Sequence, residues 1–523
     1  MSDALNTPEQ FVPDEIIPHR HLPPLRYRDL PEAPHWTKLV GPSIMLAGLA
    51  LGSGEFIFWP YLTYKTGFVF FWACMVGALT QFFINMEIER WTLLTGESAT
   101  TGFCRLSRGW AGVFLLLNFL PWIWPGWATG AATMLSWLCF GVQEVTTAAG
   151  VEYKALYVPY IAIAGMLFVG LMLTTGPVVY NTVEKIQVWL VALICVIAVL
   201  IGCLVIRADA IVAMVSGIVT NFGSLPTEQH GIDTVAILGA IAFAGAGGTM
   251  NLGQSNFIKD KGYAMGRYVG RITSPITGNE ETVSDVGYHF PHTPENMRRW
   301  RDWWRAANIE HFFSFYMTCV VCLVLLALIS YSLFYDASGS LKPGMERFGK
   351  DMNFVWGEAG LIEALFTSPI VGKAIRFLFF VMGVAILFTT ELGVLDATSR
   401  ISTDIIKVNF LRENDSWSSG RLYFLILWGQ IAIGCAILLT GTLVPSFSQP
   451  LFLLKTSAAM NGGVMFLYSM ILLYLNAKIL PRGLAITPLR FVVLIWSCAF
   501  FGYFTILALK LEVLPYLFGR SSV

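Results

Sequence analysis

Glycines and a single carboxylate interrupt the first long apolar stretch of this chain. The residues at its centre are Gly52, Ser53, Gly54 and Glu55. Because glycine is a poor helix former and a carboxylate at bilayer depth costs about 2.5–3.5 kcal/mol on insertion scales, a purely anchoring span would carry neither. An opened helix exposes carbonyls that can coordinate cations and N–H groups that attract anions. These four residues are therefore predicted to bind substrate. The alternative is a kinked helix in which Glu55 pairs with Lys455.

A second apolar stretch is interrupted in the same way. Gly245-Ala246-Gly247-Gly248 is followed directly by Thr249, Met250 and Asn251. We expect these three residues to share the substrate site with the first break. The sulfur of Met250 and the amide of Asn251 are candidate metal ligands beside the carboxylate of Glu55. The alternative is close helix packing through small residues, which is common in membranes.

Polar residues in two later apolar stretches could complete the site. Thr389, Thr390 and Glu391 follow one another in the first of these stretches. They are candidates for a coupling-ion site, in which the two threonine hydroxyls would hold sodium together with backbone carbonyls of the first break. Alternatively, these hydroxyls bond back to carbonyls of their own helix. In the second stretch, Lys455 could neutralise Glu55 or replace a coupling cation, and Ser457 is a candidate substrate ligand.

The composition indicates that membrane-spanning helices hold these residues. The chain has 523 residues, of which 55% are hydrophobic and 13% charged, and its mean hydropathy is +0.62. Soluble domains carry about 25% charged residues, so we expect an all-α polytopic membrane protein. Eleven apolar runs are long enough to span: near 39–66, 68–91, 110–139, 156–174, 184–206, 233–258, 311–335, 373–396, 421–441, 445–475 and 488–510.

The distribution of positive charge predicts the orientation. With the N-terminus inside, 23 of the 34 Lys and Arg residues fall on inner segments and 10 on outer segments, in agreement with the positive-inside rule. Residues 1–38 lack an apolar core and are predicted to be a cytosolic tail rather than a signal peptide. We expect a multi-pass protein of the cell membrane, with a cytosolic loop at 259–310 and an outer loop at 336–372.

The positions of the two breaks predict how the spans are organised. Each break lies in the first span of one half of the chain, as in transporters built from two inverted repeats. We expect a transmembrane domain at 39–510 with a 5+5 inverted repeat. The first repeat would cover about 39–206 and the second about 233–475. Residues 488–510 would form an extra helix.

Several segments resemble the Nramp (natural resistance-associated macrophage protein) divalent-metal transporters of the amino acid–polyamine–cation superfamily. The matching segments are Gly41-Pro42-Ser43, Gln81, Leu94-Thr95-Gly96-Glu97-Ser98, Gly245-Ala246 and Leu475-Asn476-Ala477-Lys478. The resemblance implies a metal transporter with broken first and sixth spans.

The binding motifs of that family are not kept. Its Asp-Pro-Gly-Asn aligns with residues 52–55, and its Met-Pro-His aligns with residues 249–251. Its tenth-span Gln falls at about Ser457, and the third span near 110–139 has no acidic residue for proton movement. Gly52-Ser53-Gly54 followed by Phe56 is similar instead to the Gly-Ser-Gly-Ile-Phe motif of amino-acid transporters in the same superfamily. In those proteins, backbone N–H groups of the break hold the carboxylate of the substrate.

These features lead to a functional expectation with one main alternative. We expect a secondary active transporter that moves a small cation, above all a divalent metal, through a site at the two broken helices. The alternative is a sodium- or proton-coupled symporter of an amino acid or other small organic solute. The spans contain no metal triad and no nucleophile–base pair, so we expect neither an enzyme nor a cofactor. The zero net charge does not indicate a nucleic-acid partner; the expected partners are the lipid bilayer and a small ion or solute.

Overall fold

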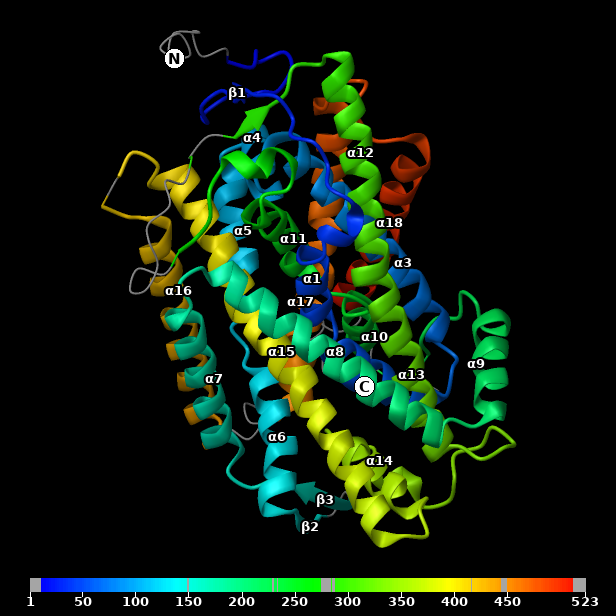
Figure 1. The fold of residues 1–523 in the computed structure, drawn as a ribbon. Coiled ribbons are helices and arrows are strands. Elements are labelled where there is room, and N and C mark those ends of the chain that lie inside the picture. Colours follow the sequence, from blue (N-terminus) through cyan, green and yellow to red (C-terminus); the bar gives the residue numbers. More distant parts are fainter. Residues whose placement is uncertain are drawn as a thin grey trace.

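The computed structural model is a bundle of long helices (Figure 1). It describes residues 11–147, 150–227, 230–232, 234–273, 284, 287–414, 416–443 and 449–510. Within these residues, nine helices are long and apolar enough to cross a membrane. They are Pro42–Thr66 (α1, Pro42–Ala50; η2, Gly54–Phe58; α2, Trp59–Thr66), Phe71–Thr95 (α3), Val158–Thr175 (α7), Val179–Val205 (α8), Pro294–Phe334 (α12, Pro294–His311; η5, Phe312–Met317; α13, Thr318–Phe334), Pro369–Phe410 (α15), Ser419–Thr440 (α16), Pro450–Ile479 (α17, Pro450–Tyr474; η8, Leu475–Ile479) and Pro488–Ala508 (α18).

Two further expected spans are each built from two shorter helices. The run near 233–258 consists of α10 (Thr234–Ala242) and α11 (Gly248–Lys261), separated at the predicted second break. The run near 110–139 consists of α5 (Gly109–Phe119) and α6 (Gly126–Phe140). The sequence analysis did not predict this third break. It lies at Pro121 and Pro125, because proline lacks the N–H that would continue the helical ladder.

The remaining elements are short and lie between the long helices. They are η1 (Trp36–Lys38), α4 (Ala99–Leu106), α9 (Ala208–Thr220), η4 (Ala264–Tyr268), η6 (Met345–Phe348), α14 (Asn353–Ala364), the parallel pair β1 (Arg26–Tyr27) and β4 (Tyr288–His289), and the antiparallel pair β2 (Gln143–Thr147) and β3 (Gly150–Lys154). Such small sheets leave the protein helical, as expected.

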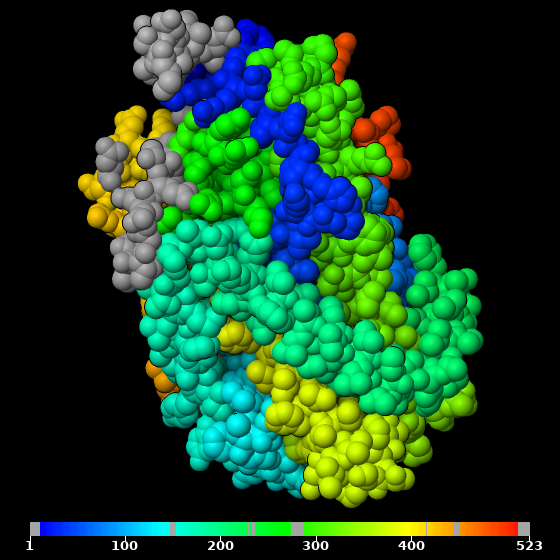
Figure 2. All heavy atoms as spheres, viewed as in Figure 1, coloured from blue at the N-terminus to red at the C-terminus, as the bar shows by residue number. Residues whose placement is uncertain are grey.

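The N-terminal segment is packed against one end of the bundle. We call this end, which carries residues 11–38 and α4, the inner end, after the side expected from the charge distribution. Figures 1 and 2 show the segment in blue beside α12. The backbone N–H of Leu30 donates to the side chain of Asn296 over 3.2 Å, and the indole of Trp303 donates to the carbonyl of Pro31 over 2.8 Å. These contacts make the segment part of the folded structure.

Candidate functional site

The first break leaves one carboxylate incompletely satisfied. Helix α1 ends at Ala50, and the chain resumes as the π-helical turn η2 at Gly54. The backbone N–H of Gly52 donates to Oε2 of Glu55 over 3.2 Å. The side chain of Glu55 is 0% exposed, and its Oε1 has no hydrogen-bond partner among the described residues. Because a buried carboxylate is costly unless it is paired, a cation or a proton beside this oxygen would stabilise it.

The second break is bridged by Gln81 of α3. Its Nε2 donates to the carbonyl of Ala242, the last residue of α10, over 2.9 Å. Its Oε1 accepts from the N–H of Gly247 and from Nδ2 of Asn251, each over 3.3 Å. Broken helices leave orphan carbonyls on one half and orphan N–H groups on the other, and Gln81 satisfies one of each. In the sequence, Gln81 stood out only through the family resemblance.

The two breaks touch at Gly54. A Cβ atom added there would lie 1.6 Å from the carbonyl oxygen of Phe243, which follows α10. No side chain other than hydrogen fits at this distance. Gly247 and Gly248 serve the second break differently: their φ angles of 73° and 49° lie in the left-handed region that favours glycine.

The third break contributes two tryptophans to the same place. Nε1 of Trp127 donates to the hydroxyl of Ser53 over 3.2 Å, and Nε1 of Trp122 donates to that of Thr249 over 2.9 Å. The two indole rings are stacked, with centroids 5.3 Å apart, and the ring of Phe243 lies 5.8 Å from Trp122 and 5.9 Å from Trp127. One aromatic cluster therefore connects all three broken spans.

A small cavity lies where the three breaks meet. It has room for the centre of about one water molecule (about 10 Å³). Its lining consists of Leu49, Ala50, Ser53, Gly54, Trp122, Trp127, Phe243, Gly245, Ala246 and Thr390. These residues come from both predicted breaks, the third break and α15, so the helices that carry several of the predicted site residues meet at this cavity.

The predicted substrate-binding residues differ in how they relate to this cavity. Ser53 and Gly54 line it, and Thr249 borders it through Trp122. Glu55, Met250, Asn251 and Ser457 are fully buried but do not belong to its lining. Asn251 uses Nδ2 for Gln81 and for the hydroxyl of Tyr468, while its Oδ1 has no partner among the described residues.

The predicted coupling-ion residues separate into two groups. Thr390 Oγ1 lies 3.1 Å from the carbonyl of Ile386 on its own helix, and 3.3 and 3.4 Å from the carbonyls of Leu49 and Leu51 at the first break. This hydroxyl therefore contacts carbonyls of its own helix and of the first break. The neighbouring Thr389 hydroxyl donates to Oε1 of Gln187 on α8, a residue that the sequence analysis did not single out.

Glu391 and Lys455 contact residues other than Glu55. The carboxylate of Glu391 accepts from the backbone N–H of Ala128 in the first turn of α6. Nζ of Lys455 lies 5.6 Å from the ring centroid of Tyr61. Among the described residues no ion pair joins Lys455 to Glu55, so the structure does not show the alternative in which these two residues pair.

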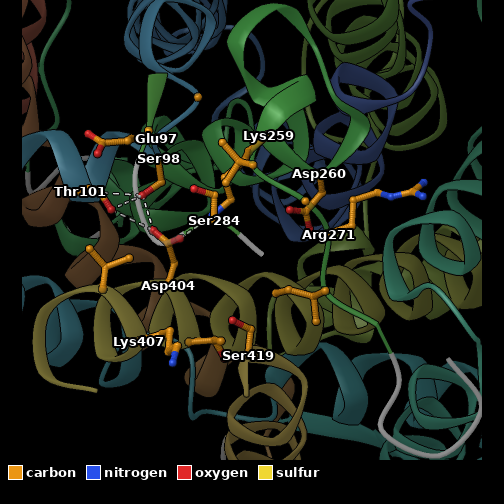
Figure 3. Close-up of a pocket in the computed structure, with 17 residues that line it drawn as sticks. Glu97, Ser98, Thr101, Lys259, Asp260, Arg271, Ser284, Asp404, Lys407 and Ser419 are labelled. Carbon is orange, nitrogen blue, oxygen red and sulfur yellow. Dashed lines mark hydrogen bonds and ion pairs between the residues drawn. The ribbon is translucent and has the colours of Figure 1, made fainter. Parts of the chain in front are cut away.

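The end of α11 is held by ion pairs at the inner end of the bundle. Lys259 pairs with Asp404 of α15, and Lys261 pairs with Glu184 of α8 over 2.5 Å. Figure 3 shows Lys259 and Asp404 in a pocket, with the hydroxyls of Ser98 and Thr101 also directed at the Asp404 carboxylate. Asp260, between the two lysines, pairs with Arg400 of α15. Three consecutive residues thus fix α11 to two long helices.

Metal ligands of the usual kinds do not converge in this structure. Among the described residues, no group of three or more His, Cys, Asp or Glu side chains could hold a metal ion. The candidate ligands Glu55, Met250 and Asn251 include only one carboxylate, one thioether and one amide. Any metal bound by them would depend on backbone carbonyls or retained water for its remaining ligands.

Comparison with known proteins identifies the fold. No family model matches the sequence, and no curated protein sequence matches it. The manganese transporter of Eremococcus coleocola, solved as the mutant H236A, superimposes with a TM-score of 0.64 at 14% identity, covering 94% of this chain and 91% of that chain. Its complex with an aromatic bis-isothiourea substituted compound gives a TM-score of 0.63 with the same identity and coverage. The chain has the fold of this transporter. The resemblance to Nramp proteins is thereby confirmed at the level of the fold.

A second solved structure shares the fold at lower similarity. MhsT in complex with L-phenylalanine superimposes with a TM-score of 0.53 at 12% identity, covering 91% of this chain and 99% of that chain. The predicted helical, polytopic class is confirmed, and these neighbours are transporters rather than enzymes, as expected.

Proposed function

We propose that the protein is a secondary active transporter that moves a small cation across the cell membrane through the site between the broken helices. The observation that carries this proposal is the buried carboxylate of Glu55. One of its oxygens is held by Gly52 and the other has no partner among the described residues. A bound cation would neutralise this charge, and alternating access would then require the breaks to open first to one side and then to the other. The N-terminal segment would lie in the cytosol, where the excess of Lys and Arg also lies.

A divalent metal ion is the first candidate for this cation. The fold shared with a manganese transporter supports it. The proposed ligands are Glu55, Met250, Asn251, the hydroxyl of Ser53 and the opened carbonyls. With one carboxylate, a hard and partly hydrated ion such as Mg²⁺ suits the site as well as Mn²⁺ or Fe²⁺ does.

A small organic solute is a second candidate, supported by the aromatic lining of the cavity. Trp122, Trp127 and Phe243 offer ring faces rather than metal ligands. Ring faces attract organic ammonium groups and apolar groups, and a solute of this kind would use Ser53 and Thr249 for its polar end. In this reading Thr390, with the carbonyls of Leu49 and Leu51, would hold a coupling sodium ion.

Uptake into liposomes by the purified protein tests the proposal. Mn²⁺, Mg²⁺, Ca²⁺ and a panel of amino acids and quaternary ammonium compounds are offered to wild type and to Glu55→Gln. We expect cation uptake by wild type and a loss of at least about tenfold in the variant, because the amide cannot supply the charge. Glu358→Gln is a matched control: Glu358 is also a buried carboxylate, but it lies on α14, away from the cavity.

The outcome separates the candidates. Metal uptake that is lost in Glu55→Gln but kept in Glu358→Gln supports the first candidate. Uptake of an organic solute alone, dependent on sodium or on a proton gradient, supports the second. Full uptake by Glu55→Gln would remove Glu55 from the site.

A further inference from the structure

Five buried polar side chains form a connected cluster near the inner end of the bundle, apart from the central cavity. Nε2 of Gln254 donates to Oε1 of Glu89 over 2.7 Å and to the hydroxyl of Ser43 over 3.2 Å. The Ser43 hydroxyl donates to Oε2 of Glu310 over 2.5 Å. Nδ1 of His311 lies 2.9 Å from the Ser43 hydroxyl and 3.3 Å from Oε1 of Glu89. The serine and the imidazole therefore link the two carboxylates.

The imidazole of His311 is held in a fixed orientation. The rings of Phe82 and Phe315 stack on it, with centroids at 5.6 and 4.8 Å and interplanar angles of 24° and 15°. The ring is fully buried, and its Nε2 has no hydrogen-bond partner among the described residues. Directly after His311 the helix changes from α12 to the π-helical turn η5, a departure that is frequent at functional sites.

The charges around the cluster leave it one proton short of neutrality. Arg90 and Arg490 both pair with Glu87, and Lys261 pairs with Glu184. With Glu89 and Glu310 ionised and His311 neutral, this neighbourhood holds three cations and four carboxylates. Among the described residues, the titratable groups that face the cluster from the surrounding elements include Glu87 and Arg90 of α3, Arg490 of α18, Glu184 and Tyr180 of α8, Lys261 of α11, and Tyr263. One added proton removes the excess negative charge.

The cluster connects the inner halves of the two predicted broken helices to neighbouring helices. Ser43 lies in the first turn of α1 and Gln254 lies on α11, the inner halves of the two predicted broken helices. Glu89 belongs to α3, while Glu310 and His311 end α12. Any separation of α1 and α11 from these helices at the inner end breaks the hydrogen bonds of the cluster.

We propose that Glu89, Glu310 and His311 form a proton-binding site that holds the inner halves of both broken helices closed. The bound proton is shared along the chain from Glu89 through His311 and Ser43 to Glu310. Its loss leaves two buried carboxylates that repel each other, which favours separation of α1 and α11 and release of the proton to the inner side. This inference rests on the proposed function only in one respect, namely that opening of the inner end is part of the transport cycle. The closing effect of the proton does not depend on which substrate is transported.

Hydrogen–deuterium exchange of the full-length protein in lipid nanodiscs tests the site without any substrate. Exchange of peptides covering 42–50 and 248–261 is measured at pH 6 and pH 8 and corrected for the intrinsic pH dependence of the exchange rate. We expect wild type to be protected about tenfold more strongly at pH 6, because the shared proton closes the cluster. Glu310→Gln, which carries a permanent neutral group, is expected to lose this pH dependence and to remain protected.

Two further variants make the test decisive. Glu358→Gln, a buried carboxylate outside the cluster, is expected to keep the wild-type pH dependence. Ser43→Ala removes the link without removing a titratable group, so its protection at pH 6 is expected to fall to the wild-type level at pH 8. The proposal is overturned if wild type shows no pH dependence, if Glu310→Gln follows wild type, or if Ser43→Ala keeps full protection at pH 6. Because no solute is present, failure here is distinct from failure of the uptake experiment.

Discussion

At the scale of single residues, the centre of the protein depends on atoms that approach one another unusually closely. Gly54 is the clearest case, because the carbonyl of Phe243 occupies the space of its missing side chain. Gln81 is a second case, since one amide serves both ends of the second break. Residues of this kind hold the shape of the site without carrying charge, and their substitution is expected to act through structure.

Gly54→Ala tests this view of the meeting of the two breaks. A Cβ atom 1.6 Å from a backbone oxygen forces the two half-helices apart, so we expect a loss of about 3 kcal/mol or more in stability. The measurement is the thermal midpoint of the purified protein, followed by size-exclusion chromatography. Gly360→Ala is the control, since no atom lies within 4 Å of its added Cβ and helix α14 should keep or slightly gain stability. Equal midpoints for the two variants would contradict the close approach.

At the scale of elements, the sequence predicted most of the helices but not how one of them is divided. Hydropathy is enough to place eleven spans, and clustered glycines are enough to place two breaks. The division of 110–139 into α5 and α6 was missed, because Pro121 and Pro125 are also compatible with a continuous kinked helix. Trp122 and Trp127 were also missed, for a different reason. Tryptophan in an apolar run is ordinary, and only the tertiary fold brings these two rings to Ser53 and Thr249.

Burial of His289 makes the contact between β1 and β4 sensitive to pH. Burial lowers the pKa of His289 from 6.5 to about 4. Nδ1 of its ring donates to the carbonyl oxygen of Leu94 over 3.1 Å, and its Nε2 lies 2.9 Å from Nε2 of His292. Because its pKa is lowered in the packed state, His289 binds a proton more tightly when β1 and β4 have separated than when they are packed together. Stability is therefore kept above about pH 6.5 and lost as the pH falls toward 4, by about 2 kcal/mol at pH 5.

Limited proteolysis of the N-terminal segment at pH 7 and pH 5 measures this effect. Residues 11–30 are expected to be cut faster at pH 5 in wild type. In His289→Gln, which cannot take up the proton, the two cleavage rates should be the same after correction for the activity of the protease. If residues 11–30 of the wild type were cut equally slowly at pH 7 and pH 5, protonation of His289 would not control the packing of the N-terminal segment.

At the scale of the whole molecule, the inner end is closed by polar contacts while the centre is closed by aromatic packing. Lys259, Asp260 and Lys261 fix α11 to α15 and α8, and the N-terminal segment covers the same end (Figures 1 and 2). The proposed transport through the central cavity would require these contacts to break on one side in every cycle. Their ionic character suits this role, because separated charges regain hydration when water enters, whereas separated apolar surfaces do not.

The pair between Lys261 and Glu184 offers a test of that closure with an internal control. Lys261→Glu places two carboxylates opposite each other, and Glu184→Lys places two cations opposite each other, so each single variant should open the inner end and speed exchange of 248–261. The double variant Lys261→Glu/Glu184→Lys restores opposite charges over the same 2.5 Å contact and is expected to recover most of the protection. A coupling free energy of about 1 kcal/mol or more between the two substitutions would identify the ion pair as a closing contact. This is at the upper end of the range for exposed ion pairs, and the pair is only partly exposed. If the double variant exchanges as fast as the two singles, the pair between Lys261 and Glu184 is not a closing contact, and the closure of α11 rests on its other contacts, such as those of Lys259 and Asp260.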